Sequence, residues 1–162
     1  MRERGAWNLF DRDVLAWTIE AGIDARFLSD LAEIRLAIEP AAAALAAERR
    51  TEGDLAALEA GLSRMRAEPS DSIGFAEGDL ALHVAVAVAS GNPFMRSIGG
   101  VIEVALRASF QLSAPVEAAE RETVLAAHAA IVAAIAARDA AGAAEAVRQV
   151  IHNGLRRHGA AA

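Results

Sequence analysis

The sequence contains no cysteine and few aromatic residues, which make up only 4% of its 162 positions. Without cysteine the chain can form neither disulfide bonds nor a zinc site with thiolate ligands. The shortage of aromatic residues counts against β-sheets, because strands are enriched in aromatic and β-branched side chains. These absences leave helical folds, and any metal site must use histidine and carboxylate ligands.

The sequence also lacks an excess of positive charge and a long apolar run. Its net charge is −6 at pH 7 and its pI is about 5.2, whereas a free-standing nucleic-acid-binding domain is usually basic. No apolar stretch reaches the ~20 residues that a transmembrane helix needs, and no signal-peptide pattern follows Met1. We therefore expect a cytoplasmic protein that has no contact with a membrane and does not itself bind nucleic-acid phosphates.

What the sequence does contain is an apolar fraction of 54%, mainly Ala with Leu, Val and Ile. Alanine is the best helix former, so this composition predicts an all-α protein. Apolar residues at helical spacing, together with capping residues and Gly or Pro breaks, predict an antiparallel bundle of six to seven helices. Pro40 lies inside the second helix and is expected to kink or divide it. The predicted helices cover approximately residues 11–21, 24–50, 51–67, 72–89, 93–112, 117–137 and 140–158.

The helix expected over residues 72–89 carries two polar side chains, Asp79 and His83, on a face that is otherwise Leu, Val and Ala. Four residues separate them, which is roughly 40° around a helix, so both point to the same side. Burying either group alone is costly, and a shared metal ion would satisfy both. His128, one position off the apolar stripe of a later helix, is the third candidate ligand. Such ligands suit a divalent ion, with Zn²⁺ favoured and Ni²⁺ or Mn²⁺ as alternatives.

The fourth ligand position is less clear from the sequence. His152 follows Val150 and Ile151 and could point inward, so it is the candidate for this position. Three protein ligands would leave coordination positions for water or for an acidic ligand. The alternative interpretation is that each histidine is an ordinary core or surface residue and that Asp79 is an exposed carboxylate in the first turn of its helix.

Two arginines lie beside apolar residues and are candidates for binding an acidic ligand. A guanidinium group in an apolar bundle requires an anion, and its two parallel N–H donors fit a carboxylate. Arg35 and Arg107 are therefore predicted to bind such a ligand, and Asn92 is predicted to take part in the same site. The alternatives are ion pairs within one helix, between Arg35 and Glu39 and between Arg107 and Glu103. No nucleophile elbow and no glycine-rich phosphate loop is present, so no catalytic residue is predicted.

Several short motifs follow one another along the chain. They are R-x-x-x-E-P (Arg35, Glu39, Pro40), L-A-A-E-R (Leu45 to Arg49), D-x-x-x-H (Asp79, His83), A-S-G-N (Ala89 to Asn92) and H-x-x-I-x-x-A-I (His128 to Ile135) with R-D (Arg138, Asp139). In this order they resemble the FCD domain, the C-terminal ligand-sensing domain of FadR-subfamily GntR transcription regulators, over about residues 27–157. The opening W-N-L-F-D-x-D-V-L-x-W resembles the linker helix of the sugar-acid (galactonate-type) branch.

The resemblance implies an all-α bundle that forms a homodimer and holds a divalent metal, often zinc, through one Asp and three His. It also implies a pocket for a small carboxylate effector, which can complete the coordination of the metal. Asp79, His83 and His128 match the first three ligand positions, and Arg35 matches a position that often faces the effector. The fourth ligand position falls at Val150. His152 comes two residues later and would serve only if the last helix began differently.

The resemblance thus implies a linker and short helix in residues 1–24 and an effector-binding and dimerisation domain in residues 25–159. The expected function is to sense a metal-bound carboxylate, most plausibly a sugar acid, in a regulator whose winged helix-turn-helix binds operator DNA. That DNA-binding domain would precede Trp7 and is absent from this chain. We expect no enzymatic activity. The alternatives are a metal-dependent hydrolase or lyase of helical-bundle fold, or a structural dimerisation bundle without metal.

Overall fold

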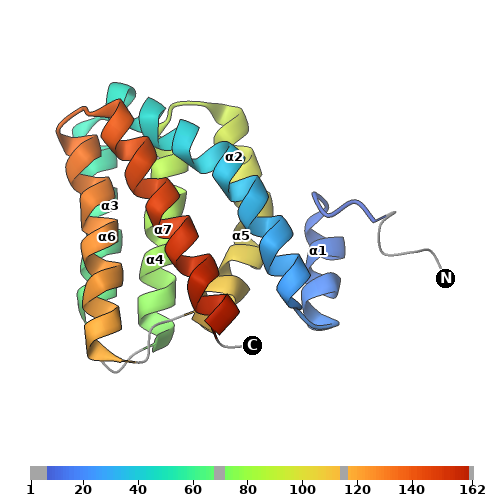
Figure 1. Cartoon of the computed structure of the whole chain (residues 1–162). Helices are drawn as coiled ribbons and strands as arrows, with labels where there is room; N and C mark the ends of the chain where they lie inside the picture. The colour runs from blue at the N-terminus through green and yellow to red at the C-terminus, as the bar shows by residue number, and fades with distance from the viewer. Residues whose placement is uncertain (1–6, 68–71, 114–116, 161–162) are drawn as a thin grey trace.

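The computed structural model describes residues 7–67, 72–113 and 117–160, and these residues form seven α-helices and no β-strand (Figure 1). The all-α prediction is therefore confirmed. Within these ranges no helix is both long enough and apolar enough to span a bilayer. The helices are α1 (Arg12–Glu20), α2 (Ala25–Arg49), α3 (Glu52–Ala67), α4 (Ser72–Ala89), α5 (Pro93–Ser113), α6 (Ala118–Ala136) and α7 (Ala140–Ala160).

The helix starts follow local capping chemistry. The Asp11 carboxylate accepts hydrogen bonds from two backbone N–H groups at the start of α1, and Asp24 does the same for the N–H of Phe27 in α2. At the start of α3 the Thr51 hydroxyl accepts from the N–H of Asp54, while the Asp54 carboxylate accepts from the N–H of Thr51. Such caps satisfy backbone donors that a helix leaves without partners, which is why the sequence located these boundaries within a few residues.

The helix α2 runs from Ala25 to Arg49 without a break, although Pro40 lies inside it. The expectation that Pro40 would divide the helix is wrong. An interior proline costs roughly 3 kcal/mol, because it removes one backbone hydrogen bond and crowds the preceding turn. Packing offsets this cost, because α2 lies against α7, α4, α6 and α5, and its buried residues include Pro40 and several alanines.

The core of the bundle lies between α2, α3, α4, α6 and α7. Figure 1 shows α4 in the interior of the bundle and α1 to one side of it. α4 packs against α3, α5 and α2, which explains why its sequence is apolar on nearly every face. α1 packs on α5 and has one buried residue, Leu15.

The helices α3 and α4 pack backbone against backbone. A Cβ atom added to Gly78 would lie 2.7 Å from the backbone nitrogen of Met65 and 3.0 Å from the carbonyl oxygen of Gly61. A side chain at position 78 would therefore force the two helices apart. Gly78 directly precedes Asp79, so this close contact also fixes the first candidate metal ligand.

Three arginines tie the helices together at one end of the bundle. Arg49 donates to the carbonyl of Ser90 at the end of α4 (3.0 Å), and Arg50 donates to the carbonyl of Ala136 at the end of α6 (2.8 Å). Arg138 donates in return to the carbonyl of Glu48 near the end of α2 (2.9 Å). Each guanidinium binds carbonyl groups that a helix C-terminus leaves without intrahelical partners.

Candidate metal centre

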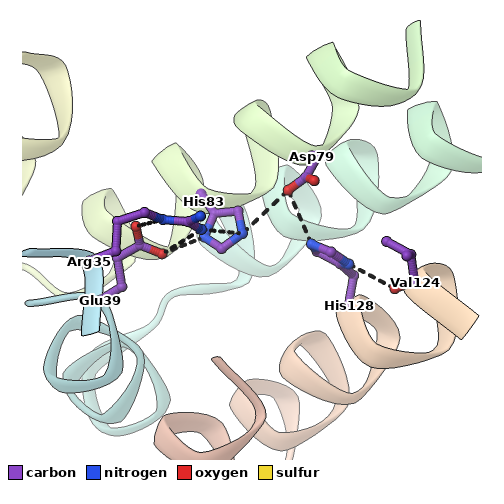
Figure 2. A network of polar contacts seen from close by, with 6 residues as sticks. All are labelled: Arg35, Glu39, Asp79, His83, Val124 and His128. Atoms are coloured by element: carbon purple, nitrogen blue, oxygen red, sulfur yellow. Dashed lines mark hydrogen bonds and ion pairs between the residues drawn. The ribbon is translucent and has the colours of Figure 1, made fainter. Parts of the chain in front are cut away.

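The side chains of Asp79 and His83 on α4 and of His128 on α6 converge inside the bundle (Figure 2). Their exposed fractions are 6%, 6% and 1%. One potential ligand atom from each residue lies within 4.8 Å of the others. Helical spacing had placed Asp79 and His83 on one face, and the packing of α6 brings His128 to them.

The distances from Asp79 to the two histidines suit a tetrahedral metal ion. Oδ1 of Asp79 lies 3.3 Å from Nε2 of His83 and 3.1 Å from Nε2 of His128. Ligand atoms that are each about 2.0–2.1 Å from a tetrahedral zinc ion lie roughly 3.3 Å apart. Two nitrogens and one carboxylate oxygen are also the donor set that zinc and similar divalent ions accept. The residues therefore fit such an ion.

Both imidazoles are oriented by a partner on their other ring nitrogen. Nδ1 of His128 lies 2.8 Å from the carbonyl oxygen of Val124, and because a carbonyl only accepts, Nδ1 must carry the proton. Nδ1 of His83 lies 2.8 Å from Oε2 of Glu39 on α2. Partners of this kind fix the tautomer and the ring orientation of metal-binding histidines. In both rings it is Nε2 that faces Asp79.

Glu39 is itself held by Arg35, one turn earlier on α2. Nε of Arg35 donates to Oε1 of Glu39 at 2.7 Å, and Nη2 lies 3.3 Å from Oε2. The predicted intrahelical pair is therefore present. The guanidinium also reaches beyond it: Nη2 lies 3.5 Å from Nε2 of His83, and Cζ lies 4.9 Å from the centre of the Phe110 ring.

Charges inside the cluster outweigh the effect of burial. Burial alone would raise the pKa of both carboxyl groups, but the positive charges of His128 and His83 bring the pKa of Asp79 well below its usual range. In the same way Arg35 and His83 lower the pKa of Glu39 to about 2. Burial would lower the pKa of His83, but Glu39 and Asp79 raise it to about 9. Without a metal, His83 is thus an imidazolium between two carboxylates, and a metal ion would replace its proton.

The structure does not bring His152 to this cluster. α7 begins at Ala140, as the sequence predicted, and the side chain of His152 is exposed. Val150, which is buried, lines the adjoining cavity instead. The expectation that His152 completes the site therefore lacks structural support, because a shift of two residues on a helix turns a side chain by roughly 200°. Three ligands come from the part of the chain that the structure describes.

A small cavity adjoins the cluster on the side of α2, α5 and α7. Its volume is about 20 Å³, and Asp79, Arg35, Phe110, Val150 and Arg157 are among the residues that line it. A volume of this size holds about one water molecule. Burial lowers the pKa of the Arg157 guanidinium, and the charges of Glu120 and Asp79 oppose that shift. Two guanidinium groups and one carboxylate thus share the wall of the cavity.

The other two predicted effector contacts lie elsewhere. Oδ1 of Asn92 accepts a hydrogen bond from the N–H of Phe94 at 2.9 Å, so Asn92 caps α5. Arg107 is exposed and pairs with Glu77 of α4 and, at 3.3 Å, with Glu103 of its own helix. Neither residue lines the cavity beside the cluster. Their roles are explained by helix capping and by ion pairs at the surface.

Sequence reasoning missed the contact between Glu39 and His83 and the place of Phe110 and Arg157 beside the site. Glu39 had an adequate partner four residues away, which concealed its second contact with α4. The available signal for an inward-facing Glu39 was its place between an apolar residue and Pro40. No signal in the sequence located Phe110 or Arg157, because their position depends on how α5 and α7 pack.

This chain is similar to known proteins along most of its length. The FCD domain model matches residues 30–153. The galactonate operon transcriptional repressor of Escherichia coli (strain K12) is 36% identical over 154 residues, which are 95% of this chain and 67% of the repressor.

Two solved structures have a similar fold. E. coli McbR/YncC has a TM-score of 0.71 at 22% identity and covers 83% of this chain, which spans 69% of that protein. A GntR protein of Streptococcus agalactiae has a TM-score of 0.65 at 29% identity and covers 81% of this chain, which spans 59% of it. The chain thus corresponds to about two thirds or less of the length of these proteins.

Proposed function

This chain belongs to the FCD domain family of GntR transcription regulators, and from this we propose that it senses a small acid bound next to a metal ion. Its relatives are transcription regulators rather than enzymes, which confirms the prediction that the chain is not an enzyme. The family and the site both support an effector-binding regulatory domain. The proposal also names a metal ion, an effector and partner molecules.

The proposed metal ligands are Asp79, His83 and His128. The observation that carries this assignment is the convergence of their ligand atoms within 4.8 Å in the interior of the bundle. Zn²⁺ is the favoured ion, and Ni²⁺ and Mn²⁺ share its preference for nitrogen and oxygen donors in such a site. When bound, the metal supplies a coordination position that a carboxylate can take. Arg35 and Arg157 lie where they can pair with the rest of such an anion.

The proposed effector is a small carboxylate, with a sugar acid as the favoured class. The support is that the E. coli relative is named for the galactonate operon and that two guanidinium groups line the cavity beside Asp79. The cavity volume of about 20 Å³ is far below the roughly 300 Å³ or more of typical ligand pockets. Binding must therefore displace side chains of α2, α5 or α7. A domain that widens around its ligand has two states with different ligand affinity, which is what a sensor requires.

The proposal extends to the whole regulator. Residues 25–159 would form the effector-binding and dimerisation domain, and residues 1–24 a linker with the short helix α1. A second copy of the chain would complete a homodimer. Operator DNA would be bound through a winged helix-turn-helix domain outside the residues that the structure describes, and the regulator would act in the cytoplasm.

Metal analysis and thermal unfolding together test this function. The purified chain, without a histidine tag, should contain close to one equivalent of zinc and lose it to a chelator. Galactonate should raise the melting temperature of the zinc-loaded protein, following RT ln(1 + [L]/Kd), and galactitol, which lacks the carboxylate, should not. A protein that binds no divalent metal, or one that galactonate and other sugar acids fail to stabilise, would contradict the proposal.

A further inference from the structure

The guanidinium of Arg35 lies at the nitrogen of His83 that a metal would use. Nη2 of Arg35 is 3.5 Å from Nε2 of His83, and the same Nε2 is 3.3 Å from Oδ1 of Asp79. We propose that Arg35 competes with the metal ion at this position, and that an acid which draws Arg35 toward the cavity strengthens metal binding. This inference rests on the proposed metal site and adds a mechanism that couples the metal to the effector.

The competition follows from the chemistry of the two side chains. A guanidinium is always protonated and has only donors, so Arg35 cannot itself bind a cation. A divalent ion on Nε2 of His83 would bind the nitrogen that lies 3.5 Å from Nη2 of Arg35. With the ion bound, two cations would lie a few ångströms apart in a buried site, where their repulsion is weakly screened. Arg35 therefore lowers the metal affinity of the protein when no acid is present.

The cavity offers Arg35 a second position. Arg35 lines it together with Asp79, Phe110 and Arg157, and Cζ of Arg35 lies over the Phe110 ring at 4.9 Å. The flat ring allows the guanidinium to turn toward the cavity while keeping contact with the aromatic face. An acid in the cavity would pair with Arg35 there and remove its charge from His83.

The loss of the contact between Arg35 and Glu39 would also strengthen metal binding. Glu39 now shares its carboxylate between Arg35, at 2.7 Å, and Nδ1 of His83, at 2.8 Å. When Arg35 turns away, the full negative charge of Glu39 acts on His83, which makes its Nε2 a better ligand. Metal and acid would thus bind with positive coupling, and each would raise the affinity of the other by the same factor.

The first test compares zinc affinity in two arginine variants by competition with a chromogenic chelator. Arg35→Gln should bind zinc about tenfold more tightly than the wild type, because a positive charge beside the ion is lost. Arg107→Gln removes an exposed arginine of α5 that lies outside the cavity, and it should change zinc affinity less than about twofold. Unchanged or weaker zinc binding in folded Arg35→Gln overturns the inference.

The second test uses the wild-type protein and so does not depend on the folding of a variant. Galactonate should tighten zinc binding to the wild type, by a larger factor than it does for Arg35→Gln where that variant folds, and galactitol should have no effect. Galactonate that binds without changing zinc affinity contradicts the coupling. A wild-type protein that binds no zinc contradicts the proposed function itself, so the two failures can be told apart.

Discussion

Nδ1 of His83 on α4 lies 2.8 Å from Oε2 of Glu39 on α2, so the candidate metal centre is supported from a helix that supplies none of its three ligands. This contact holds the ring with Nε2 toward Asp79. It also connects the metal centre to Arg35 through a carboxylate that both cationic side chains share.

Glu39→Gln should weaken zinc binding about 10- to 100-fold, because partners on the outer nitrogen of a metal-binding histidine have effects of this size. The amide keeps the shape of the carboxylate but loses its charge. Chelator competition measures the change. Glu103→Gln, which removes a partly exposed carboxylate on α5, is the control and should leave zinc affinity within about twofold. Equal affinities in the two variants would show that Glu39 does not act on the metal.

Asp79→Ala should lower zinc content and melting temperature together. The substitution removes one ligand and leaves His83 and His128 buried without their carboxylate, which typically costs about 3–5 kcal/mol for a buried ion pair. Metal analysis and thermal unfolding of the same samples check both effects. Asp30→Ala removes an exposed carboxylate of α2 and should change neither quantity appreciably. Unchanged zinc stoichiometry in Asp79→Ala would remove Asp79 from the ligand set.

The metal-free protein should lose stability as the pH rises from 7 to 9. The pKa of His83 is raised from 6.5 to about 9, so its contribution is fully present below pH 6.5 and disappears as the pH passes 9. The contribution amounts to as much as about 3 kcal/mol. Glu39 has the opposite sign: its pKa is lowered to about 2, so its contribution is present above pH 4.5 and is lost as the pH falls through 2. Denaturant unfolding at several pH values measures the loss of stability at both ends of the pH range. His83→Gln should reduce the loss between pH 7 and 9.

Gly78→Ala should destabilise the protein by about 1–3 kcal/mol, because the added methyl group would lie 2.7 Å from the backbone nitrogen of Met65. It should also weaken zinc binding, because pushing α4 away from α3 shifts Asp79, the residue that follows position 78. Gly100→Ala on α5 is a matched control, because an added Cβ there meets nothing within 4 Å. That variant should be neutral or gain up to about 1 kcal/mol. Equal effects of the two substitutions would argue against close packing of α3 and α4.

Val150→His should strengthen zinc binding. Val150 is buried and lines the cavity beside Asp79, and it stands where the resemblance to the family places a fourth ligand. An added imidazole there would fill a coordination position that we assign to the effector. The stabilisation by galactonate should therefore become smaller while zinc affinity rises. Weaker zinc binding together with unchanged stabilisation by galactonate would place position 150 outside the coordination sphere.

The sequence was sufficient where the determinants are local. Helix boundaries depend on caps such as Asp11 and Asp24, whose partners lie within three residues. The common orientation of Asp79 and His83 follows from the helical repeat alone. His128 was a candidate from its place beside the apolar stripe of its helix, and the family resemblance matched it to a ligand position. Its location next to Asp79 depends on how α6 packs.

The sequence was insufficient where contacts cross between helices. Glu39 satisfies both Arg35 and His83, and only the packing of α2 on α4 reveals the second contact. His152 looked suitable because it is a histidine near the expected ligand position, but its face of α7 is exposed. At Pro40 the local signal was misleading, because burial along α2 overrides the tendency of proline to break a helix.

The arginine contacts at the ends of α2, α4 and α6 have a mechanical consequence. Arg49, Arg50 and Arg138 lock that end of the bundle, whereas the cavity lies toward the opposite end, beside the first half of α2 and the second half of α7. A ligand that separates α2 from α7 at the cavity would therefore rotate the two helices about the end that the arginines hold. The largest displacement would fall at Ala25, where the chain passes from α1 into α2.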